Sequence, residues 1–410
     1  MLKKINKDNF LSFFIYFCSV GLFTLADFLV IHYFSTEHIA TWAFYKSVIF
    51  VLGGMCILGF DQILLRDINK FKEIKTQFLL QSSLISLILS LFLITKLENY
   101  LDFFKLTLIL FFYSLLLFYA GYWRANKNLS NSQISTNSWK IFVFFTLLIN
   151  IFFIKFDVID VFLISLSFSV VILFFLGIFK TKKNNQLNYE NNNLLSENKK
   201  NSNIYLFMLG LYFFLHSFSL VVANYGEQLI INYFGNYEVS KVIFSYITFY
   251  SSIVLAGAGF LGFYLGPKVR YDADFGIIKY KFLLKRIFIF GICIVILNSI
   301  IVYFANLYFL KQNLNDIFLW FLVVILTILR VIYIMPSLCL GVFGSIEHLK
   351  RSAIYSLIFA LIYVIVFLFL MYRDYNELKY IVLLLMILHW MSKIYISNYY
   401  VKLGFKKRFS

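Results

Sequence analysis

The chain has 410 residues, of which 61% are hydrophobic and 14% are charged, and its formal net charge is +17. In soluble domains about a quarter of the residues are charged. This composition therefore excludes a soluble globular protein and indicates a polytopic membrane protein with very little soluble part. In a soluble protein such a positive charge would suggest nucleic acid. In a membrane protein its distribution sets the orientation instead, and no nucleic-acid partner is expected.

Apolar runs of membrane-spanning length recur along the whole chain, and the first of them is expected to be retained as a span. We predict about twelve transmembrane helices. Their approximate ranges are 10–33, 39–65, 76–95, 103–123, 139–155, 158–179, 204–225, 239–265, 287–308, 316–340, 353–372 and 378–400. The four cysteines lie inside these runs, so neither a disulfide framework, a metal site nor a cofactor is expected.

Positive charge alternates from loop to loop. One side of the predicted membrane carries 27 of the 37 Lys and Arg residues, and the other side, with nearby span ends, carries 8. Because cytoplasmic loops are enriched in Lys and Arg, both termini are predicted to be cytoplasmic.

A polar, Asn-rich segment at 181–203 shows no apolar periodicity and predicts a cytoplasmic linker. It separates an N-terminal six-helix half, 1–180, from a C-terminal six-helix half, 204–410. The predicted fold class is therefore an all-α polytopic membrane protein with two parallel six-helix bundles around a central cleft. Rocking of the halves would give alternating access.

An internal repeat supports the two halves. The hairpin at 27–66 recurs 200 residues later, and an alignment without a gap places Asp27 on Glu227 and Phe44 on Phe244. A run of such matches, with an acid on an acid and a turn on a turn, is typical of transporters built from structural repeats.

Charged side chains inside the spans are the candidate functional residues, because a charge at mid-bilayer costs about 2.5–3.5 kcal/mol. Arg330 lies in the middle of the tenth span, and His389 and Lys393, four residues apart, share one face of the twelfth. The other candidates, central in the seventh span or closer to the outer membrane surface, are His216, Lys46, Asp27 and Glu227.

Each candidate also has a structural interpretation. Either lysine could snorkel to the membrane surface, either histidine could be a neutral packing residue, and the two acids could pair with Lys46 and Lys241. Arg330 is the hardest to explain in this way, because it keeps its proton and lies too deep to snorkel easily. Since the deep charges are cationic, the sequence predicts a cleft for an anion, with Arg suited to bidentate phosphate binding.

An enzyme is not expected. The sequence has no HExxH, no paired-cysteine metal spacing and no P-loop, and no external loop exceeds roughly a dozen residues. No ATP-binding domain is present, so an ion gradient or the substrate gradient must drive any transport.

The first hairpin resembles that of the Wzx-type polysaccharide flippases, which belong to the multidrug/oligosaccharidyl-lipid/polysaccharide exporter superfamily. The resemblance rests on the short polar turn and on the closing residues Gly59, Phe60, Asp61 and Arg66. The segment from Glu227 to Pro267 is similar to the second-half signature of that family, and 124–127 is similar to its basic turn after the fourth span.

This resemblance implies a flippase that moves an undecaprenyl-pyrophosphate-linked oligosaccharide, an O-antigen or capsule repeat unit, across the bacterial inner membrane. The cavity cations of the family map onto Arg330, Lys46 and Lys393, and His216 and His389 complete the predicted substrate-binding set. Asp27 and Glu227 are the candidates for ion coupling or gating by H⁺ or Na⁺. The implied partners are the lipid-linked oligosaccharide, membrane lipids and the polysaccharide polymerase machinery.

Other functions stay open. An ion-coupled multidrug or small-molecule antiporter of the same superfamily is the first alternative, although the excess of deep cations argues against a cationic drug. Lipid II flippases usually have more spans than are predicted here. A membrane-embedded glycosyltransferase or polymerase is a further alternative, which a long external loop would have supported.

Overall fold

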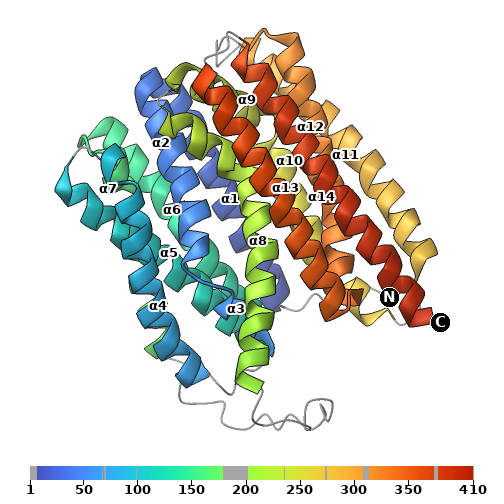
Figure 1. Ribbon diagram of the computed structural model, residues 1–410. Coiled ribbons are helices and arrows are strands. Elements are labelled where there is room, and N and C mark those ends of the chain that lie inside the picture. The colour runs from blue at the N-terminus through green and yellow to red at the C-terminus, as the bar shows by residue number, and fades with distance from the viewer. Residues whose placement is uncertain are drawn as a thin grey trace. The chain divides into compact units, whose positions relative to one another are not determined.

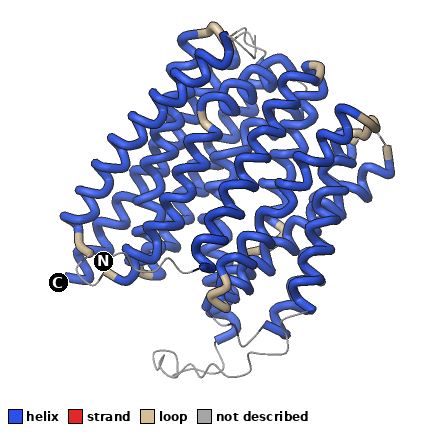
Figure 2. Tube along the Cα trace, turned by 180° about the vertical axis from the view of Figure 1, so that it is seen from behind, coloured by secondary structure: helices blue, strands red, loops and turns tan. Residues whose placement is uncertain are grey.

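The computed structural model describes residues 7–66, 68, 71–97, 99–178, 202–234, 236–272, 275–307, 314–373 and 377–409. Within these ranges every regular element is a helix and no strand is found (Figures 1 and 2). The predicted all-α class is therefore confirmed. The predicted linker lies outside the described residues as far as residue 201, and the next helix begins at Ser202.

The helices follow the predicted spans along the chain. They are α1 (Lys7–Tyr33), α2 (Thr36–Val48), a π-helix (Ile49–Gly53), α3 (Phe60–Arg66), α4 (Phe71–Phe92), a 3₁₀ turn (Ile94–Lys96), α5 (Tyr100–Ala125), α6 (Leu129–Phe152), α7 (Val158–Ile178), α8 (Ser202–Tyr233), α9 (Tyr237–Tyr250), α10 (Ser252–Tyr271), α11 (Ile277–Ala305), α12 (Ile317–Phe343), α13 (Ile346–Arg373) and α14 (Leu378–Phe409).

Membrane crossing accounts for the length of most of these helices. Among the described residues, nine helices are long and apolar enough to span a membrane, or ten if the bent pair α9–α10 is one span. The remaining two predicted spans correspond to α8 and to the interrupted segment α2–α3. The chain is thus a multi-pass membrane protein.

Internal packing divides the chain into two compact units. The N-terminal unit contains the described residues of 1–20 and 52–214, and the C-terminal unit contains those of 21–51 and 215–410. The part of the first hairpin on either side of its turn, residues 21–51, thus belongs with the C-terminal unit, where α2 packs on α9. The predicted division at 181–203 and the central cleft stay predictions.

In the N-terminal unit, Asp8 of α1 caps the start of α6. Its carboxylate accepts hydrogen bonds from the backbone N–H of Leu129 (3.0 Å) and Ser130 (3.2 Å) and from the Ser130 hydroxyl, which places an anion at the positive end of the helix dipole. The predicted start of this span at residue 139 is wrong for this reason. The N-cap residue Asn128, whose side chain accepts from the Asn131 N–H at 3.0 Å, and this contact from α1 together start α6 at Leu129, ahead of the polar stretch 129–138.

Paired hydroxyls join the other helices of this unit. The Ser82 and Ser114 oxygens of α4 and α5 lie 2.6 Å apart, and the Ser165 hydroxyl of α7 donates to Thr146 of α6 at 3.4 Å. All four side chains are buried. Hydrogen bonds of this kind between membrane helices contribute about 0.6 kcal/mol each on average.

The second predicted span is interrupted, so its prediction as one continuous helix over 39–65 is wrong. After the π-helix, the chain turns through Leu58 (φ 47°) and Gly59 (φ 73°) before α3 begins. Glycine adopts this conformation without a steric cost. A side chain at Gly121 of α5 would come within 2.8 Å of the Asp61 Cβ, so glycine there lets α3 approach α5 closely.

In the C-terminal unit, the break between α9 and α10 bends the chain by 52°. A break inside a membrane frees backbone carbonyls that must find other donors. The Asn298 amide of α11 donates to the carbonyls of Phe249 and Tyr250, each at 3.1 Å. The carbonyls of Phe249 and Tyr250 at the bend therefore both have hydrogen-bond donors.

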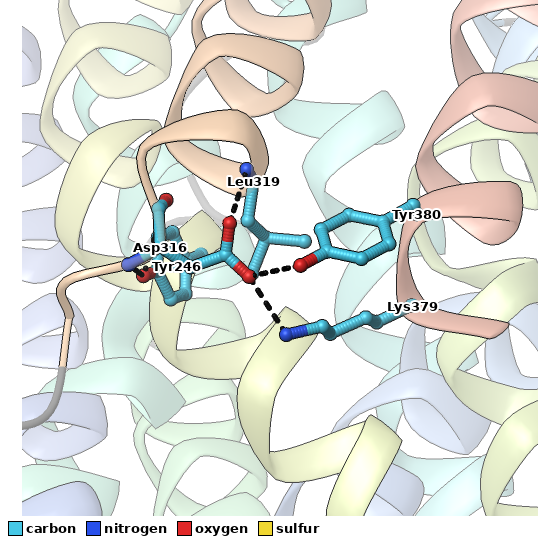
Figure 3. Close-up of polar contacts among 5 residues, drawn as sticks. All are labelled: Tyr246, Asp316, Leu319, Lys379 and Tyr380. Atoms are coloured by element: carbon cyan, nitrogen blue, oxygen red, sulfur yellow. Dashed lines mark hydrogen bonds and ion pairs between the residues drawn. The ribbon is translucent and has the colours of Figure 1, made fainter. Parts of the chain in front are cut away.

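A polar network fixes the ends of the helices that carry the candidate site (Figure 3). Asp316 caps α12 through the Leu319 N–H (3.0 Å), and its carboxylate also accepts from Lys379 (2.7 Å) and Tyr380 (2.6 Å) of α14. The Tyr246 hydroxyl of α9 accepts from the Asp316 N–H at 2.9 Å. Burial raises the pKa of Asp316, but these hydrogen bonds outweigh it, and the pKa lies below its ordinary value.

The two repeat hairpins have matching turns, with one difference in register. Ser35 accepts from the His38 N–H and begins α2, and Asn236 accepts from the Val239 N–H and begins α9. The helices before the turns end at positions 200 apart, but the caps are 201 apart. The match of Phe44 with Phe244 stays a prediction.

Candidate functional site

Asp27 lies in a fully paired environment inside the C-terminal unit. Its two carboxylate oxygens accept hydrogen bonds from Lys46 Nζ at 2.5 Å and from Trp42 Nε1 at 2.9 Å, and the residue is 1% exposed. The ion pair of Asp27 with Lys46, which the structural interpretation of this acid predicts, is thus present. Its role in ion coupling or gating stays a prediction.

Lys46 is enclosed between the acid and two aromatic rings. Its ammonium lies 4.7 Å from the ring centre of Phe23 and 5.3 Å from that of Phe244, positions in which a cation is attracted to the ring face. Lys241 instead donates to the Thr36 hydroxyl at 3.0 Å. The interpretation that Lys241 pairs with the second acid is therefore wrong.

Glu227, the repeat equivalent of Asp27, faces Arg330 of α12. The nearest atoms of the two charged groups, Glu227 Oε1 and Arg330 Nη2, lie 3.6 Å apart, and the residues are 0% and 6% exposed. Within the described part of the chain, neither Glu227 oxygen and neither Nε nor Nη2 of Arg330 has a hydrogen-bond partner. The pair thus carries opposite charges in contact without the hydrogen bonds that usually accompany burial.

Lys393 and His389 of α14 lie on the same side of the site. The Lys393 ammonium donates to the Ser219 hydroxyl of α8 at 2.7 Å and lies 5.5 Å from the Tyr333 ring centre, and the residue is 1% exposed. The His389 ring packs edge-on against Tyr363 at 4.8 Å. Neither of its nitrogens has a hydrogen-bond partner among the described residues. Because Lys393 is almost completely buried, snorkelling of its side chain to the membrane surface does not explain its position.

Trp390 connects these groups. Its indole N–H donates to the Ala223 carbonyl of α8 at 2.9 Å, its ring lies 5.6 Å from the Arg330 guanidinium, and it packs edge-on against Tyr333. Three helices, α8, α12 and α14, thus bring together two basic side chains, one acid and one imidazole. We call this set the buried charge cluster: Glu227 of α8, Arg330 of α12, and His389 and Lys393 of α14, with Tyr363 of α13 beside them.

The structure separates the predicted site residues into three groups. Four of them form the buried charge cluster, and Asp27 and Lys46 form a pair of their own on α1 and α2. His216 lies in α8, and its side chain is outside the described residues. Sequence reasoning missed Ser219, Tyr333, Tyr363 and Trp390. Trp390 and Tyr333 carried a usable signal, because they lie one and three residues from His389 and Arg330.

The chemistry of the cluster suits an anion more than a metal ion. Two basic side chains outnumber one carboxyl group, and Arg330 presents unpartnered N–H donors beside its acid. No group of three or more His, Cys, Asp or Glu residues that could hold a metal is found in the described ranges. An incoming anion would therefore meet Arg330 and Lys393 and would compete with Glu227.

Comparison with solved structures identifies the fold. The chain is similar to a structure described as the inward-facing conformation of a multidrug resistance MATE family transporter of the MOP superfamily. The match covers 98% of this chain and 99% of the other, with a TM-score of 0.53 and 15% sequence identity. The likeness is one of fold. No protein-family model matches the sequence, and no curated protein matches it either.

Proposed function

We propose that this protein is a flippase of the Wzx type. It would move an undecaprenyl-pyrophosphate-linked oligosaccharide across the bacterial inner membrane by alternating access, with both termini in the cytoplasm. The observation that carries the proposal is the buried charge cluster. Two basic side chains lie buried in the spans α12 and α14, and one acid, Glu227, lies close to Arg330 among the described residues.

A pyrophosphate provides what this cluster lacks. Its oxygens can accept hydrogen bonds from the unpartnered N–H groups of Arg330 in a bidentate manner, and Lys393 can supply a second positive charge. Burial of an isolated cation is costly unless an anion compensates it. The polyprenyl tail would stay in the bilayer while the phosphates enter the unit.

Ion coupling would use the acids. Glu227 is the stronger candidate, because an anion that binds Arg330 takes away its only charged partner among the described residues. Asp27 keeps two hydrogen bonds of its own in any such event. H⁺ and Na⁺ both remain open as the coupling ion, and the polysaccharide polymerase machinery is a proposed partner.

A second candidate is an ion-coupled multidrug antiporter. Two observations favour it: the similar structure is described as a multidrug transporter, and a buried carboxylate such as Glu227 can attract a cationic drug. The balance of charge in the cluster argues against it.

One experiment separates the two candidates. Purified protein in proteoliposomes is given either a fluorescent undecaprenyl-pyrophosphate oligosaccharide or ethidium, a cationic drug, under the same ion gradients. Accelerated flipping of the lipid without movement of ethidium would support the flippase. Ethidium movement without flipping would overturn it in favour of the antiporter.

A further inference from the structure

The N-terminal unit contains a second buried polar set, which carries no charge. Its members are the Ser12 hydroxyl of α1, the Trp123 indole N–H of α5, and the side chains of Asn131, Ser135 and Ser138 of α6. Each residue is at most 6% exposed. Within the described ranges, the three serine hydroxyls, the Trp123 indole N–H and the Asn131 amide nitrogen have no hydrogen-bond partner. We call this set the neutral polar cluster.

Three of these residues form one face of α6. Asn131, Ser135 and Ser138 are spaced i, i+4 and i+7, which places them above one another on a helix. Ser132 points toward α5, because its hydroxyl donates to the Ala120 carbonyl at 3.0 Å. Ser130 meets α1 through Asp8. Since each residue turns by about 100°, Asn131 and its face point between α1 and α5.

The neighbouring helices contribute the remaining two groups. Ser12 lies four residues after Asp8 on α1, so it shares the face that meets the start of α6. Trp123 lies three residues after Ala120 on α5, and its carbonyl accepts the Asn128 N–H at 2.9 Å just before α6 begins. Donors and acceptors from three helices therefore gather around one end of α6.

Other hydroxyls in the same unit show what a purely structural role looks like. Ser82 bonds Ser114 and Ser165 bonds Thr146, so these serines are satisfied across helix contacts. A buried polar group without a partner is costly, and each one in a native structure requires an explanation. The neutral polar cluster is therefore not explained as interhelical hydrogen bonding.

We infer that the neutral polar cluster binds an uncharged, polyhydroxylated ligand, namely the sugar part of the transported lipid. Hydroxyl, amide and indole N–H groups match sugar hydroxyls in hydrogen-bonding capacity, and none of them attracts a phosphate by charge. This inference rests on the proposed function. Because the groups are buried in this conformation, the sugar reaches them when α1 and α6 separate.

The test measures binding of two short-chain polyprenyl pyrophosphates, one bearing an N-acetylhexosamine and one without a sugar. The variant carries Ser135→Ala and Ser138→Ala. The matched control carries Ser82→Ala and Ser165→Ala, the same chemical change at partnered positions. Thermal unfolding of each purified variant checks that the fold is retained.

We expect the Ser135/Ser138 variant to bind the glycosylated probe about tenfold more weakly than wild type and the sugar-free probe within about twofold. The control should bind both probes as wild type does. Ser12→Ala, on a different helix, should show the same selectivity and gives a second test if the double variant fails to fold.

Three results would contradict the inference in different ways. Equal wild-type affinity for the two probes would remove the sugar site and leave the proposed function intact. An equal loss for both probes in the Ser135/Ser138 variant would assign the cluster to packing. If wild type binds neither probe, the proposed function fails and the sugar site fails with it.

Discussion

Asp27 and Glu227 occupy equivalent positions in the two repeat hairpins, yet their surroundings differ. Asp27 has a lysine and an indole N–H within hydrogen-bond distance, whereas Glu227 has one guanidinium at 3.6 Å and no hydrogen bond among the described residues. Both are almost completely buried. A satisfied buried pair contributes to the fold when intact, and an unsatisfied one is available to a ligand.

The largest stability effect should come from breaking the satisfied pair. Lys46→Ala leaves the Asp27 charge buried without its cation, and we expect the free energy of unfolding to fall by about 3–5 kcal/mol. Thermal and denaturant unfolding in detergent measure this change in the free energy of unfolding. Lys241→Ala is the matched control, since it removes only a hydrogen bond to the Thr36 hydroxyl, and should cost about 1 kcal/mol or less. Similar losses for the two variants would contradict the assignment.

Glu227→Gln and Asp27→Asn should divide activity from stability. We expect Glu227→Gln to reduce flipping at least about tenfold (about 1.4 kcal/mol in the barrier). Its cost in stability comes from leaving Arg330 without its charged partner and not from lost hydrogen bonds, because neither Glu227 oxygen has a hydrogen-bond partner among the described residues. Asp27→Asn should lower stability more and leave the flipping rate of the folded fraction within about threefold. Initial flipping rates, normalised to folded protein, measure both. The reverse division would show that Asp27 is the coupling acid.

Asp316, like Asp27, is an acid whose carboxylate is fully hydrogen-bonded, and it provides a comparison with Asp27 and Glu227. Asp316→Asn should reduce stability by about 1–2 kcal/mol at pH 7 through weaker bonds to Lys379 and Tyr380. Because the pKa of Asp316 is lowered in the folded state, its contribution is fully present above the unfolded value of about 4 and is lost as pH falls through the folded pKa. Below about pH 4, the advantage of wild type over Asp316→Asn in the free energy of unfolding should therefore shrink progressively as the pH falls. An advantage that does not shrink with falling pH would contradict this.

The smallest effects should come from the turns, which are alike in the two hairpins. Ser35→Ala and Asn236→Ala each remove one helix cap, and each should cost about 1 kcal/mol of stability with normal transport. Unfolding midpoints of the two variants provide the comparison. Losses that differ by more than about 1 kcal/mol would mean that the repeat is not equivalent at its turns.

Composition and apolar run length were enough to predict the helices, because a membrane span must be long, apolar and hydrogen-bonded within itself. Boundaries that depend on distant residues were not predictable. The start of α6 is bonded by Asp8 of α1 in addition to its own N-cap Asn128, and the interruption after α2 depends on Gly59 and on the close approach of α3 to Gly121. No local pattern contains those contacts.

The candidate site was predictable to the same extent. The cost of a buried charge pointed to Arg330, Lys393 and Glu227, and the structure brings them together. Which acid pairs with which cation could not be predicted, since Lys46 and Lys241 occupy similar places in the sequence but only Lys46 reaches an acid in the described structure.

Transport by Arg330 variants tests most simply whether the buried charge cluster binds the anionic headgroup. Flipping of a lipid-linked oligosaccharide in proteoliposomes is compared for wild type, Arg330→Ala and Arg330→Lys at matched amounts of folded protein. We expect Arg330→Ala to abolish flipping. Arg330→Lys should restore part of it if charge alone is needed and none if the bidentate geometry is needed. Normal transport by Arg330→Ala would contradict the account, because the buried charge cluster would then have no role in binding the anionic headgroup.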